Sequence, residues 1–192
     1  MRRFSVVVSA IFNYYFWSPI GIIAAVLRTG LTNNQIMALL PLLLILDVIL
    51  PILIFFWLVK IGKIKDASLK KREERYLIFG LSVLLFAVSS LLSFLLANNL
   101  FFALHFLMFI MALTIFVITL FFKISGHMLL NAGFIFILNF LFGWSLLWLF
   151  LIVPIVAFAR LYLKRHTPLE ILAGVVVGLA EPILILKIFK LI

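Results

Sequence analysis

The residues best suited to chemistry gather in one short stretch, Ala159 to Glu170, of a chain that is otherwise mostly apolar. Within it, Arg160 precedes His166 by six residues and Glu170 follows His166 by four. An Arg guanidinium can bind two oxygens of a phosphate at once. A carboxylate one helical turn away can orient a His and stabilise its cationic form. These residue types at this spacing predict a phosphate site with a histidine nucleophile.

A second polar segment, Lys123-Ile124-Ser125-Gly126-His127, opens an apolar stretch about forty residues upstream. A helix that begins here would present unpaired N–H groups and the positive end of its dipole, which attract an anion. Gly126 permits close approach of the backbone, and Ser125 adds a hydroxyl. A second interpretation stays open, in which Ser125 is only a helix cap and His127 only an interfacial side chain.

The start of the last apolar stretch also has a purely structural interpretation. Thr167 suits a helix N-cap, Pro168 suits the first helical position, and Glu170 falls where a capping box places its acid. Glu170 is therefore predicted to orient His166, to cap the helix, or to do both.

Taken together, the two polar segments predict phosphoryl transfer through a histidine. One His attacks phosphorus, cations hold the non-bridging oxygens, and a second His protonates the leaving oxygen. The chain has no Cys and six acidic residues. None of them forms an Asp-rich motif that could hold Mg²⁺. We therefore expect neither a metal nor a cofactor, and the prenyltransferase and CDP-alcohol phosphotransferase classes are disfavoured.

These motifs resemble the type 2 phosphatidic acid phosphatase superfamily, the lipid phosphate phosphatases. The family signatures are Lys-x6-Arg-Pro, Pro-Ser-Gly-His and Ser-Arg-x5-His-x3-Asp. In this chain they correspond to Lys65-x6-Arg72-Glu73, Ile124-Ser125-Gly126-His127 and Ala159-Arg160-x5-His166-x3-Glu170.

The resemblance implies a role for each matched residue. His166 would be the nucleophile, Glu170 would take the place of the orienting Asp, and His127 would be the general acid for the leaving alcohol. The implied phosphate-binding residues are Lys65, Arg72, Ser125, Gly126 and Arg160.

The chain also departs from the family pattern. Ile124 replaces Pro, Ala159 replaces Ser, Glu170 replaces Asp, and Glu73 stands where the first motif has Pro. Two apolar stretches separate the first motif from the second, whereas in the family one loop usually connects them. Arg75 or Lys123 could supply the charge instead, and residues 60–75 could simply be a solvated basic loop.

The elements that must position these residues are membrane helices. The 192-residue chain is 67% hydrophobic and has a mean hydropathy of +1.38, which a soluble domain could not bury. Apolar runs of about twenty residues predict helices rather than a barrel. We expect a single all-α membrane domain, 1–192, with a weak N-terminal segment at 4–27. This segment has Asn13 and Ser18-Pro19 in its middle and is expected to be kinked or partly interfacial, with spanning left open. The six core spans are expected at 35–59, 76–96, 100–122, 128–142, 145–160 and 168–189.

Topology places the polar segments on one face. Two spans lie between 60–75 and 123–127, and two more between 123–127 and 160–170, so the chain returns to the same side each time. Most Lys and Arg residues lie in these segments, and the positive-inside rule predicts a cytoplasmic face, here of the plasma membrane.

The sequence therefore predicts a membrane phosphatase that acts on a lipid phosphate or pyrophosphate, polyprenyl or phosphatidate-like. Its partners would be this substrate and the bilayer, without nucleic acid. The alternative is a small transporter or lipid-binding scaffold that keeps the fold without the activity. In that case Asp47, His105 and Glu181 would be polar pathway residues. Their structural interpretations are a hydrogen bond for Asp47, a helix–helix hydrogen bond for His105 and a kink at Glu181-Pro182.

Overall fold

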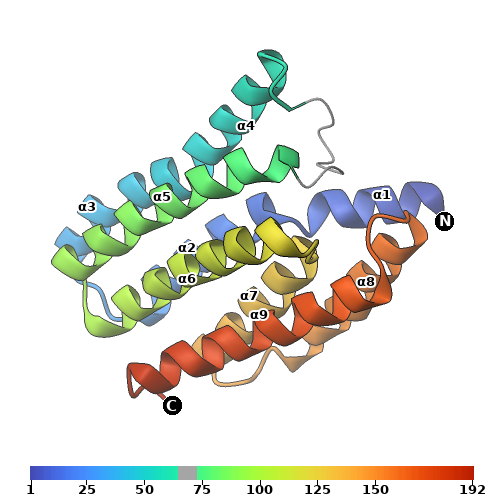
Figure 1. Ribbon diagram of the computed structural model, residues 1–192. Coiled ribbons are helices and arrows are strands. Elements are labelled where there is room, and N and C mark those ends of the chain that lie inside the picture. The colour runs from blue at the N-terminus through green and yellow to red at the C-terminus, as the bar shows by residue number, and fades with distance from the viewer. Residues whose placement is uncertain (65–72) are drawn as a thin grey trace. The chain divides into compact units, whose positions relative to one another are not determined.

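The computed structural model describes residues 1–64 and 73–192, and these residues form helices and no strand (Figure 1). The all-α fold predicted from the sequence is confirmed. The α-helices are α1 (Arg2–Ile11), α2 (Tyr14–Arg28), α3 (Asn33–Leu44), α4 (Leu50–Lys60), α5 (Glu73–Leu96), α6 (Asn99–Phe121), α7 (Gly126–Leu141), α8 (Ile152–Tyr162) and α9 (Pro168–Ile188). A π-helical segment, η1 (Ile45–Ile49), joins α3 to α4, and a 3₁₀ segment, η2 (Leu147–Leu151), leads into α8.

The helices have the lengths expected of a polytopic membrane protein. Among the described residues, five helical stretches are long and apolar enough to cross a membrane: Arg2–Arg28, Asn33–Lys60, Glu73–Leu96, Asn99–Phe121 and Pro168–Ile188. The weak N-terminal segment thus reaches spanning length. The stretches expected at 128–142 and 145–160 are two shorter apolar helices, Gly126–Leu141 and Leu147–Tyr162.

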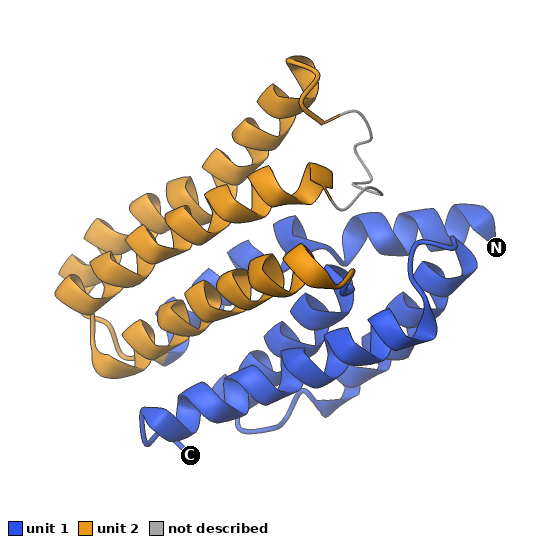
Figure 2. Ribbon diagram, viewed as in Figure 1, with its two compact units in different colours: residues 1–28, 124–192 blue, residues 29–123 orange. Residues whose placement is uncertain are grey.

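The chain divides into two compact units (Figure 2). Unit 1 comprises residues 1–28 and 124–192, and unit 2 comprises residues 29–123. Both polar segments of the predicted site, apart from Lys123, belong to unit 1. The sequence predicts a single membrane domain, and the division into two compact units does not test that prediction.

In unit 1, α7 is the central helix, and most of its side chains are buried. The N-terminal segment runs parallel to it. Trp17 Nε1 donates to Asn131 Oδ1 at 3.0 Å near the start of α7, and Arg28 Nε donates to the Leu141 carbonyl at 3.0 Å at its end. Such a buried central helix is surrounded by protein, which suits its shorter length.

The predicted kink in the N-terminal segment occurs at Phe12-Asn13, where α1 ends and α2 begins. The Asn13 side chain bonds to local backbone, donating to the Ala10 carbonyl at 2.8 Å, and so competes with the helix. Asn131 Nδ2 donates to the Phe12 carbonyl at 3.0 Å. The α2 helix continues through Pro19. Asn13, rather than the proline, therefore sets the break.

Two glycines bring α9 against α7. A Cβ at Gly174 would lie 2.6 Å from the Ser125 carbonyl oxygen, and one at Gly178 would overlap the Leu129 backbone. Small residues four apart allow close backbone approach between membrane helices. The contacts advance in the same direction along both helices, so α7 and α9 are parallel and begin at the same end of unit 1.

In unit 2, α5 and α6 form an antiparallel hairpin, and the α3–η1–α4 stretch packs on α5. Asn98 caps α6 by accepting from the Phe101 N–H at 3.0 Å, and its Nδ2 donates to the Thr29 carbonyl at 2.6 Å.

Candidate functional site

A short polar contact of the predicted site lies at the start of α9. His166 Nδ1 lies 2.6 Å from Glu170 Oε2. Thr167 is the N-cap, and its Oγ1 accepts from the Glu170 N–H at 3.3 Å. The Thr167 half of the predicted capping box is thus present, while the Glu170 carboxylate bonds to His166. Glu170 contributes its backbone to the cap and its carboxylate to the histidine.

The N-terminus of α3 shows what the complete cap looks like. Thr32 Oγ1 accepts from the Gln35 N–H at 3.3 Å, and Gln35 Oε1 accepts from the Thr32 N–H at 2.9 Å. Glu170 occupies the same position relative to Thr167, yet its side chain turns to the histidine instead. A role in capping alone therefore does not account for the Glu170 side chain.

The contact with Glu170 determines how His166 is held. An ionised carboxylate can only accept, so Nδ1 carries the proton and Nε2 is the nitrogen suited to attack. The His166 side chain is 2% exposed and that of Glu170 is 13% exposed. The imidazole is thus oriented and shielded from bulk water, which strengthens its electrostatic interaction with the carboxylate.

A Schellman motif ends α8 just before this histidine. The Arg165 N–H donates to the Arg160 carbonyl at 3.0 Å, and the Lys164 N–H donates to the Leu161 carbonyl at 2.9 Å. Lys164 has a φ of 51°, a left-handed conformation more often taken by Gly. This tight ending fixes the short connection from Arg160, which is 7% exposed, to His166.

The start of α7 lies against the first turn of α9. The Ser125 N–H donates to the Glu170 carbonyl at 3.1 Å, which joins the two predicted motifs directly. Ser125 is the N-cap residue of α7, but its hydroxyl makes no capping bond. It is fully buried, and its Oγ has no hydrogen-bond partner in the described part of the chain. A buried hydroxyl in this state could donate to a bound anion at the helix N-terminus.

His127 makes a contact that its sequence context does not predict. Its Nε2 lies 3.1 Å from the Ser9 carbonyl of α1. A carbonyl only accepts, so this nitrogen carries a proton that points at α1. Ser5 and Ser9 lie one helical turn apart on α1, and across residues 1–64 and 73–192 neither Oγ finds a partner. In the sequence, the spacing of Ser5 and Ser9 was the one sign that this face of the N-terminal helix is polar.

One apolar cluster lies beneath all of these residues. It contains Val8, Met128, Ala159 and Ile171, together with Val156. The first four are the direct neighbours in sequence of Ser9, His127, Arg160 and Glu170. The cluster therefore brings one end of α1, α7, α8 and α9 together, and the candidate site is built at that end of unit 1.

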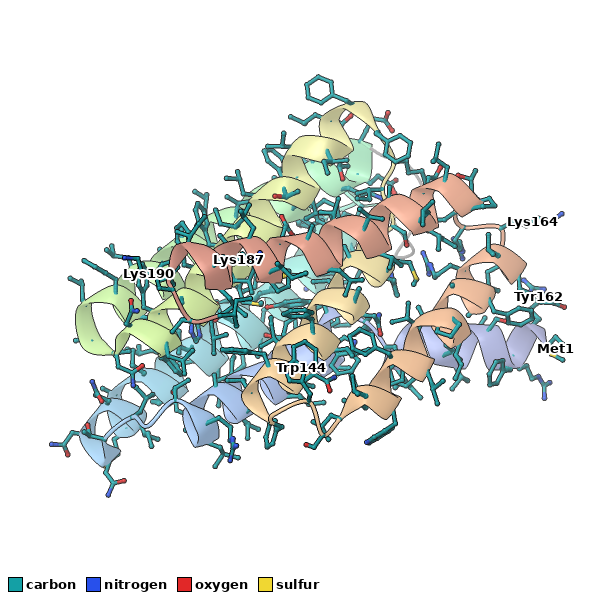
Figure 3. The ribbon with its side chains drawn as sticks, turned by 90° about the horizontal axis from the view of Figure 1, so that it is seen from below. Met1, Trp144, Tyr162, Lys164, Lys187 and Lys190 are labelled. Carbon is teal, nitrogen blue, oxygen red and sulfur yellow. The ribbon has the colours of Figure 1, made fainter. Side chains whose placement is uncertain are left out.

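The same end of unit 1 is visible in the side-chain view. Figure 3 shows Met1, Tyr162 and Lys164 together at one end, and Lys187 and Lys190 at the other. The predicted phosphate ligands Lys65 and Arg72 lie outside the described residues. Of the two substitutes, Arg75 is a buried residue of α5 in unit 2, and Lys123 directly precedes unit 1.

Nothing in the described ranges resembles a metal centre, since no group of three or more His, Cys, Asp or Glu side chains is close enough to hold an ion. Comparison of the chain with protein-family models, with curated proteins and with solved structures finds no match.

Proposed function

We propose that this protein is a membrane lipid phosphatase that works through a phosphohistidine. The observation that carries the proposal is the 2.6 Å contact between His166 Nδ1 and Glu170 Oε2, in a helix turn bonded to the N-terminus of α7. The oriented imidazole thus lies beside a helix N-terminus whose serine hydroxyl is buried and has no hydrogen-bond partner among the described residues. The resemblance of the two motifs to lipid phosphate phosphatases supports the same reaction.

In the first step, the Nε2 lone pair of His166 attacks phosphorus, and the bond from phosphorus to the leaving oxygen breaks. The ring becomes cationic as the P–N bond forms, and the Glu170 carboxylate stabilises that charge through Nδ1–H. The Ser125 hydroxyl, the N–H groups of the first turn of α7 and the Arg160 guanidinium would bind the phosphoryl oxygens. Water then attacks phosphorus and returns a proton to the His127 ring, the P–N bond breaks, and phosphate leaves with the His166 imidazole regenerated.

The leaving oxygen needs a proton, and His127 is the proposed donor. Its Nε2 proton is directed at the Ser9 carbonyl, so donation from this atom requires that bond to break. The His166 ring is likewise almost fully covered. We therefore propose that this conformation is the closed one, and that side chains around the ring move when substrate enters.

The proposed substrate is a phosphate or diphosphate monoester on a lipid tail, such as a polyprenyl or phosphatidate-like lipid. Its headgroup would lie at the membrane interface while the tail remains among the helices. We place this end of unit 1 on the cytoplasmic face of the plasma membrane. The cations at this end are Arg2, Arg3, Arg160, Lys164 and Arg165, whereas those at the other are Arg28, Lys187 and Lys190.

The proposal is tested with the full chain purified in detergent. Release of inorganic phosphate is measured from polyprenyl diphosphate, polyprenyl phosphate and phosphatidate, with EDTA present throughout. We expect release from at least one of these lipids, and we expect His166→Ala to abolish it. Acid-labile phosphate on the wild-type chain, trapped by quenching during turnover, should also disappear in this variant.

Gln35→Ala is the matched control, because it removes the corresponding side chain from the α3 cap and touches no proposed site residue. It should retain release. Normal release in a folded His166→Ala protein would refute the histidine mechanism. No release from any lipid phosphate by the wild-type chain would favour a transporter or scaffold instead.

A further inference from the structure

A second histidine–carboxylate pair lies in the middle of unit 2, away from the helix ends. Asp47 belongs to η1, Ser89 to α5 and His105 to α6, and the three side chains come from separate stretches of the chain. The exposed fractions of these residues are 2%, 0% and 4%. Ser89 Oγ donates to Asp47 Oδ1 at 2.5 Å, and His105 Nε2 lies 4.0 Å from Asp47 Oδ2.

The backbone gives Asp47 this position through a π-helical turn. Pro51 follows Asp47 by four residues, so it cannot donate to the Asp47 carbonyl, and its ring would clash with that carbonyl in a regular helix. The wider turn of η1 relieves the clash, and the Leu50 N–H donates to the Ile45 carbonyl instead. Single π-helical turns of this kind are frequent at functional sites.

The partners of His105 determine its protonation. Its Nδ1 lies 3.1 Å from the Phe101 carbonyl, which can only accept, so Nδ1 carries a proton. In a neutral ring Nε2 then holds a lone pair, and this lone pair faces a carboxylate oxygen of Asp47. Two acceptors facing each other in the membrane interior repel, unless one proton lies on either of them. The geometry therefore requires one proton for the pair.

Either partner can carry this proton. With the proton on Asp47 Oδ2, the carboxylic acid faces Nε2 across 4.0 Å and both groups are neutral. With the proton on His105, an imidazolium faces the carboxylate and stacks on the Phe101 ring, whose centroid is 4.4 Å away, in a favourable cation–π contact. In both forms the pair has no net charge. Loss of the proton would leave one negative charge buried among apolar side chains.

The other titratable side chains on the described helices of unit 2 lie far from the pair along those helices. The helical elements packed around it carry such groups only toward the ends where α4 finishes and α5 begins, at Lys60, Glu73, Glu74, Arg75 and Tyr76. From Asp47 to Lys60 is thirteen residues, or roughly 20 Å of helix. Along these helices, Asp47 and His105 are thus the two titratable groups placed to hold the proton.

We propose that Asp47 and His105 form a proton-binding site in the membrane interior of unit 2. The site takes up one proton per chain, and the Ser89 hydroxyl holds the carboxylate in place. When the proton leaves, the buried negative charge weakens the packing of η1 against α5. This proposal rests on unit 2 alone and is independent of the phosphatase proposal.

The first test reads the tautomer of His105 by ¹⁵N NMR of its ring in full-length protein in lipid nanodiscs. The chain has three histidines. A variant with His127→Asn and His166→Asn leaves His105 as the single imidazole, with Asp47 intact. We expect Nδ1 to be protonated at every pH at which the protein is folded. A neutral ring with its proton on Nε2 and none on Nδ1 would overturn the proposal.

The second test locates the proton in the wild-type protein by infrared difference spectroscopy as pH is raised. We expect a carboxylic acid C=O band that loses intensity as the pH rises. The ¹⁵N resonances of His105 should change over the same pH range. Asp47→Asn should remove this band. Glu181→Gln, which alters a buried carboxylate of unit 1, should leave it. A band removed by Glu181→Gln and kept in Asp47→Asn, or the absence of any band together with a neutral His105, refutes the shared proton.

Discussion

The two histidine–carboxylate pairs of this chain differ in how they are assembled. In unit 1, His166 and Glu170 are four residues apart around one helix start, and their atoms are 2.6 Å apart. In unit 2, Asp47 and His105 come from different helices, and their atoms are 4.0 Å apart. The local pair lies at the end of its helices, where a headgroup could arrive from the interface. The long-range pair is sealed in the interior, where a proton can arrive more readily than a larger ligand.

The two separations, 2.6 Å and 4.0 Å, suit the same pair of functional groups to different proposed roles. A carboxylate in direct contact orients an imidazole and stabilises its cation, which suits a nucleophile. A carboxylate at 4.0 Å, with a serine donor on its other oxygen, leaves room for one exchangeable proton. The comparison predicts that neutralising each carboxylate will affect a different property of the protein.

Glu170→Gln should have the largest effect on phosphate release and a small one on folding. The amide keeps the shape but cannot stabilise the cationic ring, and it can favour the wrong tautomer. We expect release to fall by about 10²–10⁴-fold. The free energy of unfolding should change by about 1 kcal/mol or less, because the carboxylate is partly exposed. Phosphate release and thermal unfolding in detergent measure the two effects.

Asp47→Asn provides the contrasting half of that experiment. It should leave phosphate release within about twofold of wild type, provided that the protein folds, because the residue belongs to unit 2. Glu170→Asp, which keeps a carboxylate on a shorter side chain, should retain much of the activity. If Glu170→Gln and Asp47→Asn lowered the rate of phosphate release equally, the two pairs would not act independently.

Gly174→Ala should break the site by moving helices rather than by removing a reacting group. The new Cβ would lie 2.6 Å from the Ser125 carbonyl, so α9 must shift away from the start of α7. We expect a loss of about 1–3 kcal/mol in stability. A displacement of this kind should lower release by roughly tenfold to a hundredfold.

Gly80→Ala is the matched control in unit 2. A Cβ there would lie 3.6 Å from the Phe116 ring, an ordinary contact, and an Ala in a helix interior is favoured over Gly by about 0.5–1 kcal/mol. It should unfold at the same or a higher temperature. If Gly174→Ala behaved like Gly80→Ala, the close approach of α7 and α9 would not hold the site together.

The local features of the fold could be predicted from the sequence, because they depend on short spacings. Hydropathy located the apolar helices, and Thr167 and Pro168 indicated the start of α9. The spacing of His166 and Glu170 allowed their contact, but two roles for Glu170 remained open. The Thr167 N–H and the His166 ring compete for the Glu170 carboxylate. Which of them it binds depends on the three-dimensional arrangement, so only the structure could decide it.

Contacts between distant segments could not be predicted in this way. The bond from His127 to Ser9 requires α1 to lie along α7, and the serine spacing of α1 does not indicate which helix it contacts. Asp47 and His105 were recognised as unusual in a membrane helix, but 58 residues separate them. Their proximity follows from the hairpin of α5 and α6 and from the π-helical turn at η1. Neither feature can be predicted from the spacing of residues in the sequence.

Ser89→Ala should sharpen the description of the pair in unit 2. It removes the donor to Asp47 Oδ1 and leaves a buried acceptor with one bond fewer, which costs about 1–3 kcal/mol. Ser82→Ala on the same helix removes only a local bond to the Ile78 carbonyl, and a change within about 0.5 kcal/mol is expected. Chemical or thermal unfolding of both variants measures the difference. Equal stability of the two would mean that Ser89 does not hold Asp47.

Lys164→Gly should have the smallest effect, and it tests whether the end of α8 is strained to place His166. Lys164 has a φ of 51°, which disfavours a side chain, and Gly at this position should add about 0.5–1 kcal/mol of stability. Lys190→Gly, with a φ of 55° near the chain end, should add less, because few contacts follow it. Thermal unfolding distinguishes the two.

Phosphate release then shows whether Lys164 contributes only a turn. Lys164→Asn keeps a residue that tolerates the left-handed conformation and removes the charge. If both Lys164→Gly and Lys164→Asn retain release, the lysine is needed neither for substrate nor for the Arg160–Arg165 turn. If both lose release while their unfolding temperature holds or rises, the lysine charge acts on the anionic headgroup. The end of α8 would then belong to the substrate site as well as to its frame.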